Sequence, residues 1–165
     1  MAVRPEHRWE NCAIQIRTTP CWDPEAACFR MIYLAAAESR QEQVRLDATG
    51  APAGGESFYC LATSPDGVNW DKPFLGLYEY PALLWNGEPI GTRNNILPSA
   101  QGMLLAPVYD AGDPDPGCRF KGLAYGGGAL EPRVSADGVA WRAPGWPPLA
   151  SADEASLVLD GQRRL

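Results

Sequence analysis

The residues best suited to chemistry in this sequence are one tripeptide, Arg93-Asn94-Asn95, and a few carboxylic acids. An arginine followed by two amides can bind the hydroxyl groups of a ligand or hold a nearby carboxylate in its ionised form. An acid near such a group can act as a base or nucleophile, whereas an acid in an apolar environment can stay protonated and act as the general acid. The acids that we consider for these roles are Asp23, Asp110, Asp153 and Glu154.

Other common catalytic chemistries lack the residues that they need. The one histidine, His7, lies in the N-terminal tail, and the five cysteines form no Cys-x-x-Cys pair, so the sequence predicts neither a metal site nor a cofactor. Without a Gly-x-Ser-x-Gly motif or a histidine near a nucleophile, serine and cysteine hydrolase chemistry is disfavoured. We expect the cysteines to be reduced and to pack as small hydrophobic side chains.

An internal repeat is the most informative feature for the fold. Ser64-Pro-Asp-Gly-Val-Asn-Trp70 recurs 71 residues later as Ser135-Ala-Asp-Gly-Val-Ala-Trp141, with five of seven positions identical. Asp-Gly supplies the positive φ of a tight turn, and the tryptophan can pack on a neighbouring sheet. We therefore expect the two aspartates, Asp66 and Asp137, to accept backbone hydrogen bonds. A weaker echo matches Asp23-Pro24 and Phe29-Arg30 with Asp113-Pro114 and Phe120-Lys121.

Composition and repeat together predict an all-β fold. Glycine and proline number 17 and 16 among 165 residues, and 10% of the residues are aromatic, which is typical of short strands joined by tight turns. Each copy of the repeat predicts a small antiparallel sheet, with the polar segment 38–55 as a surface loop in the first copy. The expected strands are 12–17, 29–35, 58–64, 95–97, 103–109, 120–125 and 131–135, with short strands near Trp70 and Trp141.

Charge and hydropathy limit the partners of the protein. The net charge of −6 argues against nucleic acid, because a surface that follows phosphates needs clustered lysine and arginine. The longest apolar run, 29–37, contains Arg30 and is far shorter than the roughly 20 residues that cross a bilayer, so we expect no membrane partner. The first eight residues lack the apolar core of a signal peptide, and we therefore expect a cytoplasmic protein.

Repeated four-stranded sheets of this length predict blades of a β-propeller, which closes with four to eight blades. We expect one incomplete propeller domain over residues 1–165, with a first blade at about 12–80, a second at 81–145 and the beginning of a third at 146–165. The segment 155–165 predicts a strand, an Asp-Gly turn and the first residues of a partner strand. A hairpin that is cut in its second strand leaves an unpaired edge, which folded proteins normally avoid. The chain is thus expected to be an N-terminal fragment; pairing of two blades between molecules is the alternative.

The chain resembles a known family along most of its length, from about residue 12 onwards. The segments that carry the resemblance are Phe29–Tyr33, Ser64–Pro73, Leu75–Leu77, Arg93–Ile96, Arg119–Lys121, Ser135–Trp141 and Ser151–Glu154. In this order they resemble the five-bladed β-propeller glycosidase-like proteins, which are relatives of glycoside hydrolase families 32 and 43. The resemblance implies a longer protein, of which this chain covers two four-stranded antiparallel blades and the start of a third.

The resemblance also implies where functional residues lie. Glycoside hydrolysis needs two carboxylates, about 5–5.5 Å apart for retention and about 6.5–9.5 Å apart for inversion, and propeller glycosidases take them from inner strands of different blades. The resemblance places Arg93, Asn94 and Asn95 at the start of the second blade, as substrate-binding residues. It places Asp153 and Glu154 at the start of the third blade, as catalytic candidates.

Each of these candidates has a structural alternative. Asp23, before a proline, can be a turn residue, Asp153 and Glu154 can form a solvated turn, and the two asparagines can satisfy backbone groups at a blade junction. The sequence also departs from the invertase-type members of the family, which carry Arg-Asp-Pro where Arg93-Asn94-Asn95 stands here. An amide cannot serve as a general base at neutral pH, which puts the invertase scheme in doubt.

Two main functional hypotheses follow. The first is a carbohydrate-active, glycosidase-like propeller that hydrolyses or binds a glycan in its channel, with Asp23, Asp153 and Glu154 as catalytic residues; the chain alone is then expected to be inactive. The second is a non-catalytic propeller that binds sugar or protein, and a third possibility is a degenerate chain without independent function. Convergence of two carboxylates at one end of the inner strands favours catalysis, whereas convergence of amides and aromatic rings favours binding. The tryptophans considered for stacking on sugar rings are Trp22, Trp85 and Trp146.

Overall fold

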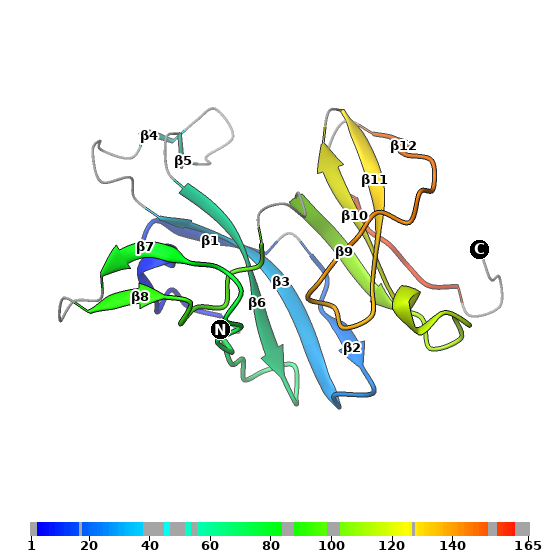
Figure 1. Ribbon diagram of the computed structural model, residues 1–165, viewed down its shortest axis with the longest axis horizontal. Helices are drawn as coiled ribbons and strands as arrows, with labels where there is room; N and C mark the ends of the chain where they lie inside the picture. Colours follow the sequence, from blue (N-terminus) through cyan, green and yellow to red (C-terminus); the bar gives the residue numbers. More distant parts are fainter. Residues whose placement is uncertain are drawn as a thin grey trace.

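The fold consists of two four-stranded antiparallel β-sheets that lie next to each other (Figure 1). The computed structural model describes residues 3–16, 18–37, 45–46, 52–53, 56–83, 88–98, 103–126, 128–151 and 155–160. Within these residues the strands are β1 (Ala13–Gln15), β2 (Cys21–Asp23), β3 (Cys28–Ala37), β4 (Arg45–Leu46), β5 (Pro52–Ala53), β6 (Glu56–Ser64), β7 (Tyr80–Leu83), β8 (Pro89–Gly91), β9 (Met103–Tyr109), β10 (Phe120–Gly126), β11 (Ala129–Ser135) and β12 (Leu149–Ala150), and Arg8–Glu10 and Pro116–Cys118 are single turns of 3-10 helix.

The first sheet, which we call sheet 1, contains β1, β2, β3 and β6. β3 lies at its centre and pairs with β6 along most of its length. β1 and β2 follow each other along the other edge of β3, β2 against its beginning and β1 against its end, so they act as one interrupted strand. Single bridges add Asp71 and Ile96 to the outer edge of β6.

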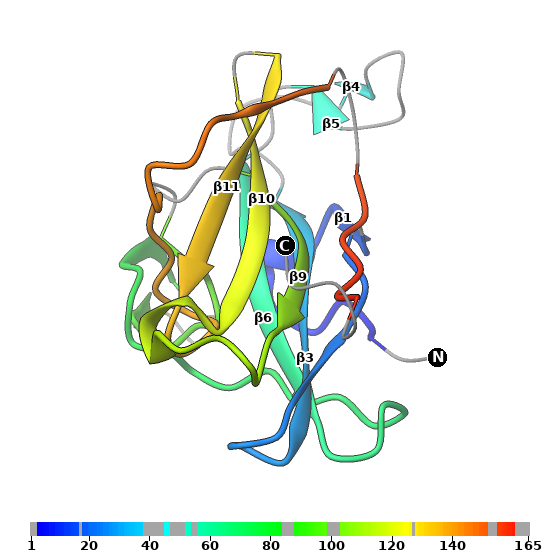
Figure 2. The same ribbon diagram turned by 90° about the vertical axis from the view of Figure 1, so that its right-hand side faces the viewer.

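The second sheet, sheet 2, is a simple meander of β9, β10, β11 and β12 in chain order. Figure 2 shows β9, β10 and β11 as neighbouring, strongly twisted strands. A right-handed twist of this kind is the ordinary consequence of L-amino-acid sterics. β12 adds only two residue pairs, and a single bridge between Val134 and Arg142 extends the same edge.

The two sheets are built on one plan, as the repeat predicts. Phe29 pairs with Ser64 between β3 and β6, and Phe120 pairs with Ser135 between β10 and β11. Because both the phenylalanine and the first serine of the repeated motif occupy matching ladder positions, β3 corresponds to β10 and β6 to β11. The prediction of two four-stranded antiparallel sheets in an all-β fold is therefore confirmed.

The repeated Ser-x-Asp-Gly segments form two turns with the same hydrogen bonds. One carboxylate oxygen of Asp66 accepts two backbone N–H groups at 2.8 Å, and Asp137 accepts the matching two at 2.9 and 2.8 Å. The indole N–H groups of Trp70 and Trp141 donate to the carbonyl of the glycine in their own turn, at 3.2 and 3.1 Å. Both aspartates are turn residues, as the sequence predicts.

The sheets meet through a hydrophobic core that both supply. Sheet 1 contributes Cys21, Ile32 and Leu61, and sheet 2 contributes Phe120 and Trp141. Alternate residues of a strand lie on the same face, so one face of sheet 1 is directed at sheet 2 along this line of contact. We call it the junction face of sheet 1.

The opposite face of sheet 1, which we call the covered face, is buried by other parts of the same chain. Trp9, only 2% exposed, packs there against Met31 and Tyr33. Tyr80 and Ile90 of the β7–β8 hairpin belong to the same cluster. Figure 1 shows this hairpin on the side of sheet 1 that is remote from sheet 2.

The structure corrects several expectations about strands. β2 was not expected, because it spans only three residues between two prolines. The short strands expected near Trp70 and Trp141 are reduced to single bridges, since prolines 73 and 144 follow and cannot donate to a ladder. Segment 38–55, expected to be a loop, contains the β4–β5 pair, and residues 155–160 form no strand pairing that the structure describes.

Candidate ligand-binding site

Two equivalent carboxylates follow the first strands of the two sheets. Trp22 of β2 and Tyr109 of β9 pair with the equivalent phenylalanines of β3 and β10. The residues that come next, Asp23 and Asp110, are therefore equivalent as well. The sequence echo that matches Asp23 with Asp113 is wrong by three residues, because the second turn is longer than the first.

Asp23 is buried, with 3% of its surface exposed, and its charge is compensated. One carboxylate oxygen accepts the Nε–H of Arg30 at 2.7 Å. The other accepts the backbone N–H groups of Glu25 at 3.0 Å and Ala26 at 3.1 Å. These contacts correspond to the turn-residue interpretation of Asp23, since both of its carboxylate oxygens are used within the protein.

Asp110 is held in a similar way by a lysine. The ammonium of Lys121 donates to Asp110 at 3.0 Å and to Asp113 at 2.7 Å. The hydrogen bond from Lys121 lowers the pKa of both carboxyl groups below the ordinary value. The acid at the end of each first strand is thus paired with a cation, Arg30 for Asp23 and Lys121 for Asp110.

A hollow of about 410 Å³ lies between β2 and β9. Its walls include Thr19, Pro20, Trp22, Val108 and Tyr109. The ring of Trp22 remains 44% exposed and is positioned by an edge contact with the phenylalanine opposite it, with 4.9 Å between ring centroids. A hollow of this size with mainly apolar walls can hold a small organic ligand.

One of the lining residues, Tyr109, is in contact with two charged side chains. The Tyr109 hydroxyl donates to Glu25 at 3.0 Å, and the Arg119 guanidinium pairs with the same carboxylate. Tyr109 lines the hollow, so this group connects the wall to the polar rim. An indole face beside a rim of hydrogen-bonding groups suits a ligand that has an apolar face and hydroxyl groups at its edges.

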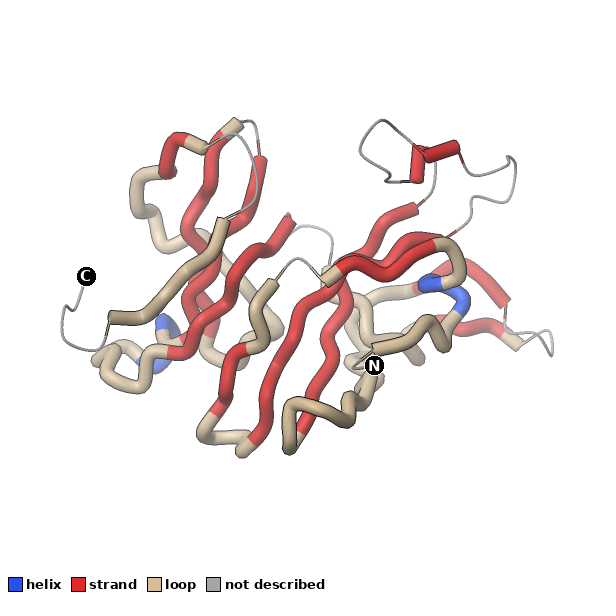
Figure 3. The backbone as a smooth tube through the Cα atoms, turned by 180° about the vertical axis from the view of Figure 1, so that it is seen from behind, coloured by secondary structure: helices blue, strands red, loops and turns tan. Residues whose placement is uncertain are grey.

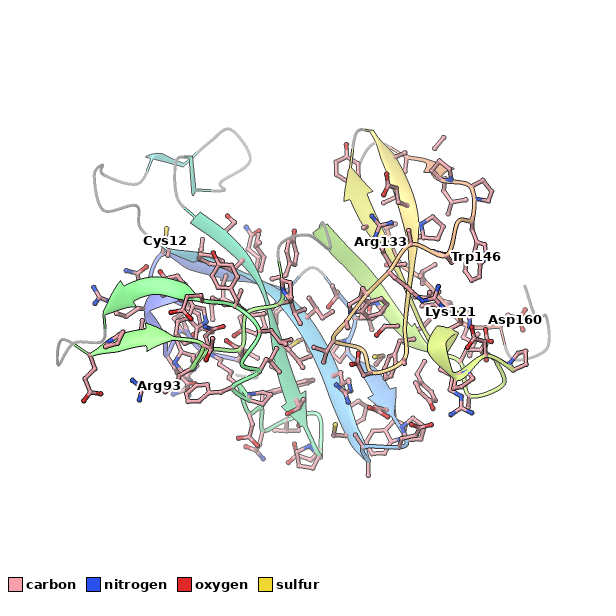
Figure 4. All side chains as sticks on the ribbon, in the orientation of Figure 1. Cys12, Arg93, Lys121, Arg133, Trp146 and Asp160 are labelled. Atoms are coloured by element: carbon pink, nitrogen blue, oxygen red, sulfur yellow. The ribbon has the colours of Figure 1, made fainter. Side chains whose placement is uncertain are left out.

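A second, larger cavity of about 570 Å³ shares walls with the first, including Val108 and Tyr109. It lies on the face of sheet 2 that is turned away from sheet 1, and its walls include Leu123 and Pro132. Trp146, 49% exposed, also lines it. Figure 4 shows Lys121, Arg133, Trp146 and Asp160 together on this side of the molecule.

The predicted substrate-binding tripeptide lies elsewhere. Arg93 is exposed and donates to the carbonyl of Pro89 at 3.1 Å, beyond sheet 1 and far from the labelled residues of sheet 2 (Figure 4). Asn94 is fully buried, and both amide hydrogens are used, at 2.7 and 2.9 Å, by the carbonyls of Tyr78 and Gly91. The structure does not bring these residues to either cavity at β9.

Asn95 belongs to a buried polar cluster that the sequence gives no sign of. Its amide donates to the Tyr33 hydroxyl at 2.7 Å and to the Leu61 carbonyl at 2.8 Å, and its oxygen accepts the indole N–H of Trp9 at 3.0 Å. All of its hydrogen-bonding groups are therefore used within the protein. This arrangement corresponds to the interpretation that the asparagines satisfy polar groups at a junction.

Glu10 is the charged centre of this cluster. It is fully buried, accepts the Tyr33 hydroxyl in a short hydrogen bond, and pairs with the Lys72 ammonium at 2.8 Å. Burial alone would raise the pKa of Glu10, but the backbone N–H of Glu6, the ammonium and the hydroxyl together lower it below its ordinary value. Burial also raises the pKa of the neighbouring Cys60 thiol and of Tyr33. The cluster holds the N-terminal segment on sheet 1.

Some predicted residues lie outside the described part of the chain, namely Asp153, Glu154 and Trp85. Among the residues that are described, no group of three or more His, Cys, Asp or Glu side chains is arranged to hold a metal ion. All five cysteines are free thiols, and burial raises the pKa of Cys21 to about 11. None of the helices that the structure describes has the length and hydropathy of a membrane-spanning segment.

Comparisons of the chain with protein families, with curated proteins and with solved structures find no match. The candidate site is therefore defined by its geometry, which is the hollow between β2 and β9 with Trp22 and Tyr109 on its wall and with Glu25, itself paired with Arg119, bound to the Tyr109 hydroxyl.

Proposed function

We propose that this chain is a carbohydrate-binding part of a β-propeller, with its two sheets as two blades and the hollow between β2 and β9 as its sugar site. Three features support the blade arrangement: the sheets share one plan, they pack face to face, and their first strands are in contact. In a propeller the blades surround a central channel, and the first strands would line it.

The single observation that carries the sugar site is the exposed indole of Trp22 on the wall of the 410 Å³ hollow. The apolar face of a pyranose ring stacks on such an indole, while hydroxyl groups at the ring edge reach hydrogen-bonding groups nearby. Glu25, Tyr109 and Arg119 supply acceptors and donors beside the hollow. The ligand class that fits is therefore a neutral sugar of one or two rings.

Binding is better supported than hydrolysis. Hydrolysis needs one carboxyl group that stays protonated and one that acts as nucleophile or base. Of the acids at the ends of the first strands, Asp23 is neutralised by Arg30, and Asp110 by Lys121. Aromatic rings rather than reactive acids line the hollow, which favours a binding role for this chain.

The test is a titration of the chain with soluble neutral sugars, namely glucose, galactose, mannose, xylose and their β-linked disaccharides. Binding is followed by the amide and indole N–H resonances in NMR spectra and by isothermal titration calorimetry. Trp22→Ala is expected to weaken binding at least tenfold, because the stacking surface is removed.

Trp146→Ala is the matched control. Trp146 is as exposed as Trp22, at 49% against 44%, but it lines the other cavity, so this variant should bind sugar as the natural chain does. Equal loss in both variants, or unchanged binding by Trp22→Ala, would remove the hollow as the site. Absence of binding to every sugar tested would overturn the proposed function.

A further inference from the structure

The 570 Å³ cavity lies on a face of sheet 2 that matches the junction face of sheet 1 position by position. The paired residues of the strands give the equivalences. The pair of Val108 in β9 and Lys121 in β10 corresponds to the pair of Cys21 in β2 and Arg30 in β3. In the same way Leu123 and Pro132 stand where Ile32 and Leu61 stand. We call these four residues of sheet 2 the open face; all of them line the cavity.

The junction face of sheet 1 shows what such a face is built to contact. There, Cys21, Ile32 and Leu61 pack against Phe120 and Trp141 of the next sheet. Arg30 completes the contact, since its guanidinium carbon lies 5.5 Å from the centre of the Phe120 ring. The cavity on the open face is thus the empty equivalent of the place that the Phe120 ring fills on sheet 1.

The segment 155–160 supports this comparison. It runs alongside β9 in Figure 3, as β9 itself lies beside β2, and Leu157 lines both cavities at β9. The segment ends in a hydrophobic residue followed by an aspartate, Leu159-Asp160. The same pattern stands at the end of β2, as Trp22-Asp23, and at the end of β9, as Tyr109 and the following Asp110. The segment therefore has the place and the sequence pattern of a first strand.

We propose that the open face is a docking surface for a third antiparallel sheet of the same plan, whose aromatic residue at the position of Phe120 enters the cavity. The proposal rests on the blade arrangement proposed above but not on sugar binding. The exposed apolar side chains around the cavity fit this occupant: Trp146, Leu149, Val158 and Leu159 are 49%, 52%, 84% and 44% exposed. An apolar surface of this kind is typical of a contact with another protein surface.

A second copy of this chain is the less suitable occupant. To fill the cavity, the second copy would have to present a face equivalent to the face of sheet 2 that carries Phe120. Its sheet 1 has such a face, which is the covered face. Trp9 and the β7–β8 hairpin already occupy that face. On the open face the 570 Å³ cavity leaves room for the aromatic ring of a further sheet, beside Ala155 and Leu157, which pack on Leu123.

The experiment supplies the third sheet. Residues 111–150 are copied after Asp160 in place of residues 161–165, so that segment 155–160 can serve as the first strand of the added sheet. The appended copy carries Trp146→Phe, so that the original Trp146 indole N–H can be followed alone by NMR. Docking is expected to slow hydrogen exchange of that indole at least tenfold and to raise the Tm of the chain by several degrees.

Matched variants identify the surface. In the extended chain, Leu149→Lys on the rim of the cavity, or Phe120→Ala in the appended copy only, should abolish the protection of Trp146. Leu77→Lys, at a leucine of similar exposure away from the cavity, should leave it intact. Circular dichroism and amide dispersion report separately whether the appended copy folds.

A folded appended copy that leaves Trp146 unprotected would overturn the proposal. So would protection that depends on chain concentration in sedimentation equilibrium, because a second molecule would then be the occupant. An appended copy that does not fold also counts against it, since the open face is proposed to template that sheet. Sugar binding is measured on the unextended chain, so the two proposals fail independently.

Discussion

Arg30 on sheet 1 lies over the ring of Phe120 on sheet 2, with 5.5 Å between its guanidinium carbon and the ring centroid. The Nε of the same arginine binds the buried Asp23 carboxylate at 2.7 Å. One side chain therefore links the turn after β2 to the core between the sheets. A guanidinium suits this double role because it can donate in its plane and stack on an aromatic ring at the same time.

Arg30→Met tests this link. The methionine keeps much of the apolar stem but leaves Asp23 buried without its partner, and removing one member of a buried pair costs about 3 kcal/mol or more. We expect a loss of about that size in the free energy of unfolding, measured in urea. Lys121→Met in sheet 2 is the control; the Lys121 and Asp110 side chains are 20% and 23% exposed, so about 1 kcal/mol is expected. Equal losses would show that Arg30 has no special role.

Glu10→Gln is expected to destabilise the protein strongly. The Glu10 side chain is 0% and the Lys72 side chain 4% exposed, so the variant leaves the buried ammonium with only the exposed Glu6 carboxylate at 3.5 Å, at a cost of about 3 kcal/mol. Urea unfolding of the variant gives the value. Glu88→Gln, which removes an exposed partner of Arg93 at 3.7 Å, should change stability by less than about 1 kcal/mol. A small effect of Glu10→Gln would mean that the buried pair is not formed in solution.

The free energy of unfolding should decrease in two steps as the pH is lowered, the first from His7 and the second from Glu10. Burial lowers the pKa of His7, so the folded state disfavours its protonated form and stability begins to fall as the pH drops below about 6.5. The pKa of Glu10 is also lowered, so its contribution is complete above about pH 4.3 and is lost as the pH falls through its folded value. The difference in unfolding free energy between the natural chain and Glu10→Gln should therefore shrink below about pH 4, whereas between pH 7 and pH 5 it should widen slightly, because the Glu10 charge raises the pKa of His7 and the variant lacks it. A difference that grows below about pH 4 would contradict this sign.

Alanine substitutions at three glycines should give a graded series. Gly76, Gly67 and Gly138 all have a positive φ, of 72°, 73° and 68°. An added Cβ would meet nothing within 4 Å at Gly76 and would lie 3.5 Å from a ring carbon at Gly67, but only 3.2 Å from Phe120 at Gly138. We expect about 1–2 kcal/mol of backbone strain at the first two positions and roughly 1–3 kcal/mol more at Gly138. Thermal unfolding of the three variants measures the order.

The chain is expected to show no turnover of aryl-glycosides. The acids at the ends of β2 and β9 are each paired with a cation, so the protonated acid and the free nucleophile that hydrolysis needs are not supplied there. The measurement is release of nitrophenol from a panel of α- and β-glycosides. Robust turnover that Asp153→Asn abolishes would contradict this expectation and would favour the glycosidase hypothesis.

The turns could be predicted from the sequence because their interactions are local. Asp66 contacts backbone groups two and three residues away, so the repeated seven residues contain everything that the turn needs. The alternation and composition of the flanking runs were likewise sufficient for β3, β6, β10 and β11. These strands are long enough, and rich enough in apolar and aromatic residues, for their sequence pattern to predict a β-strand.

The polar cluster could not be predicted in the same way. Glu10 contacts Tyr33, 23 residues away, and Lys72, 62 residues away, and Asn95 contacts Trp9, 86 residues away. No local sequence pattern predicts contacts over such separations. Arg93-Asn94-Asn95 was singled out for its chemistry, but folding directs the arginine outward and the asparagines inward. Which donors are used up is decided by tertiary structure, and residue type alone does not reveal it.

The burial of Trp9 and Glu10 on sheet 1 gives the molecule a polarity. Bare complementary surfaces at both ends would let copies add head to tail, which produces rings or fibres. Here one end is sealed by the chain itself, while the other keeps its apolar side chains accessible. The N-terminal segment thus covers an apolar face of sheet 1, and loosening it, by acid or by Glu10→Gln, should expose this face and promote association between copies of the chain.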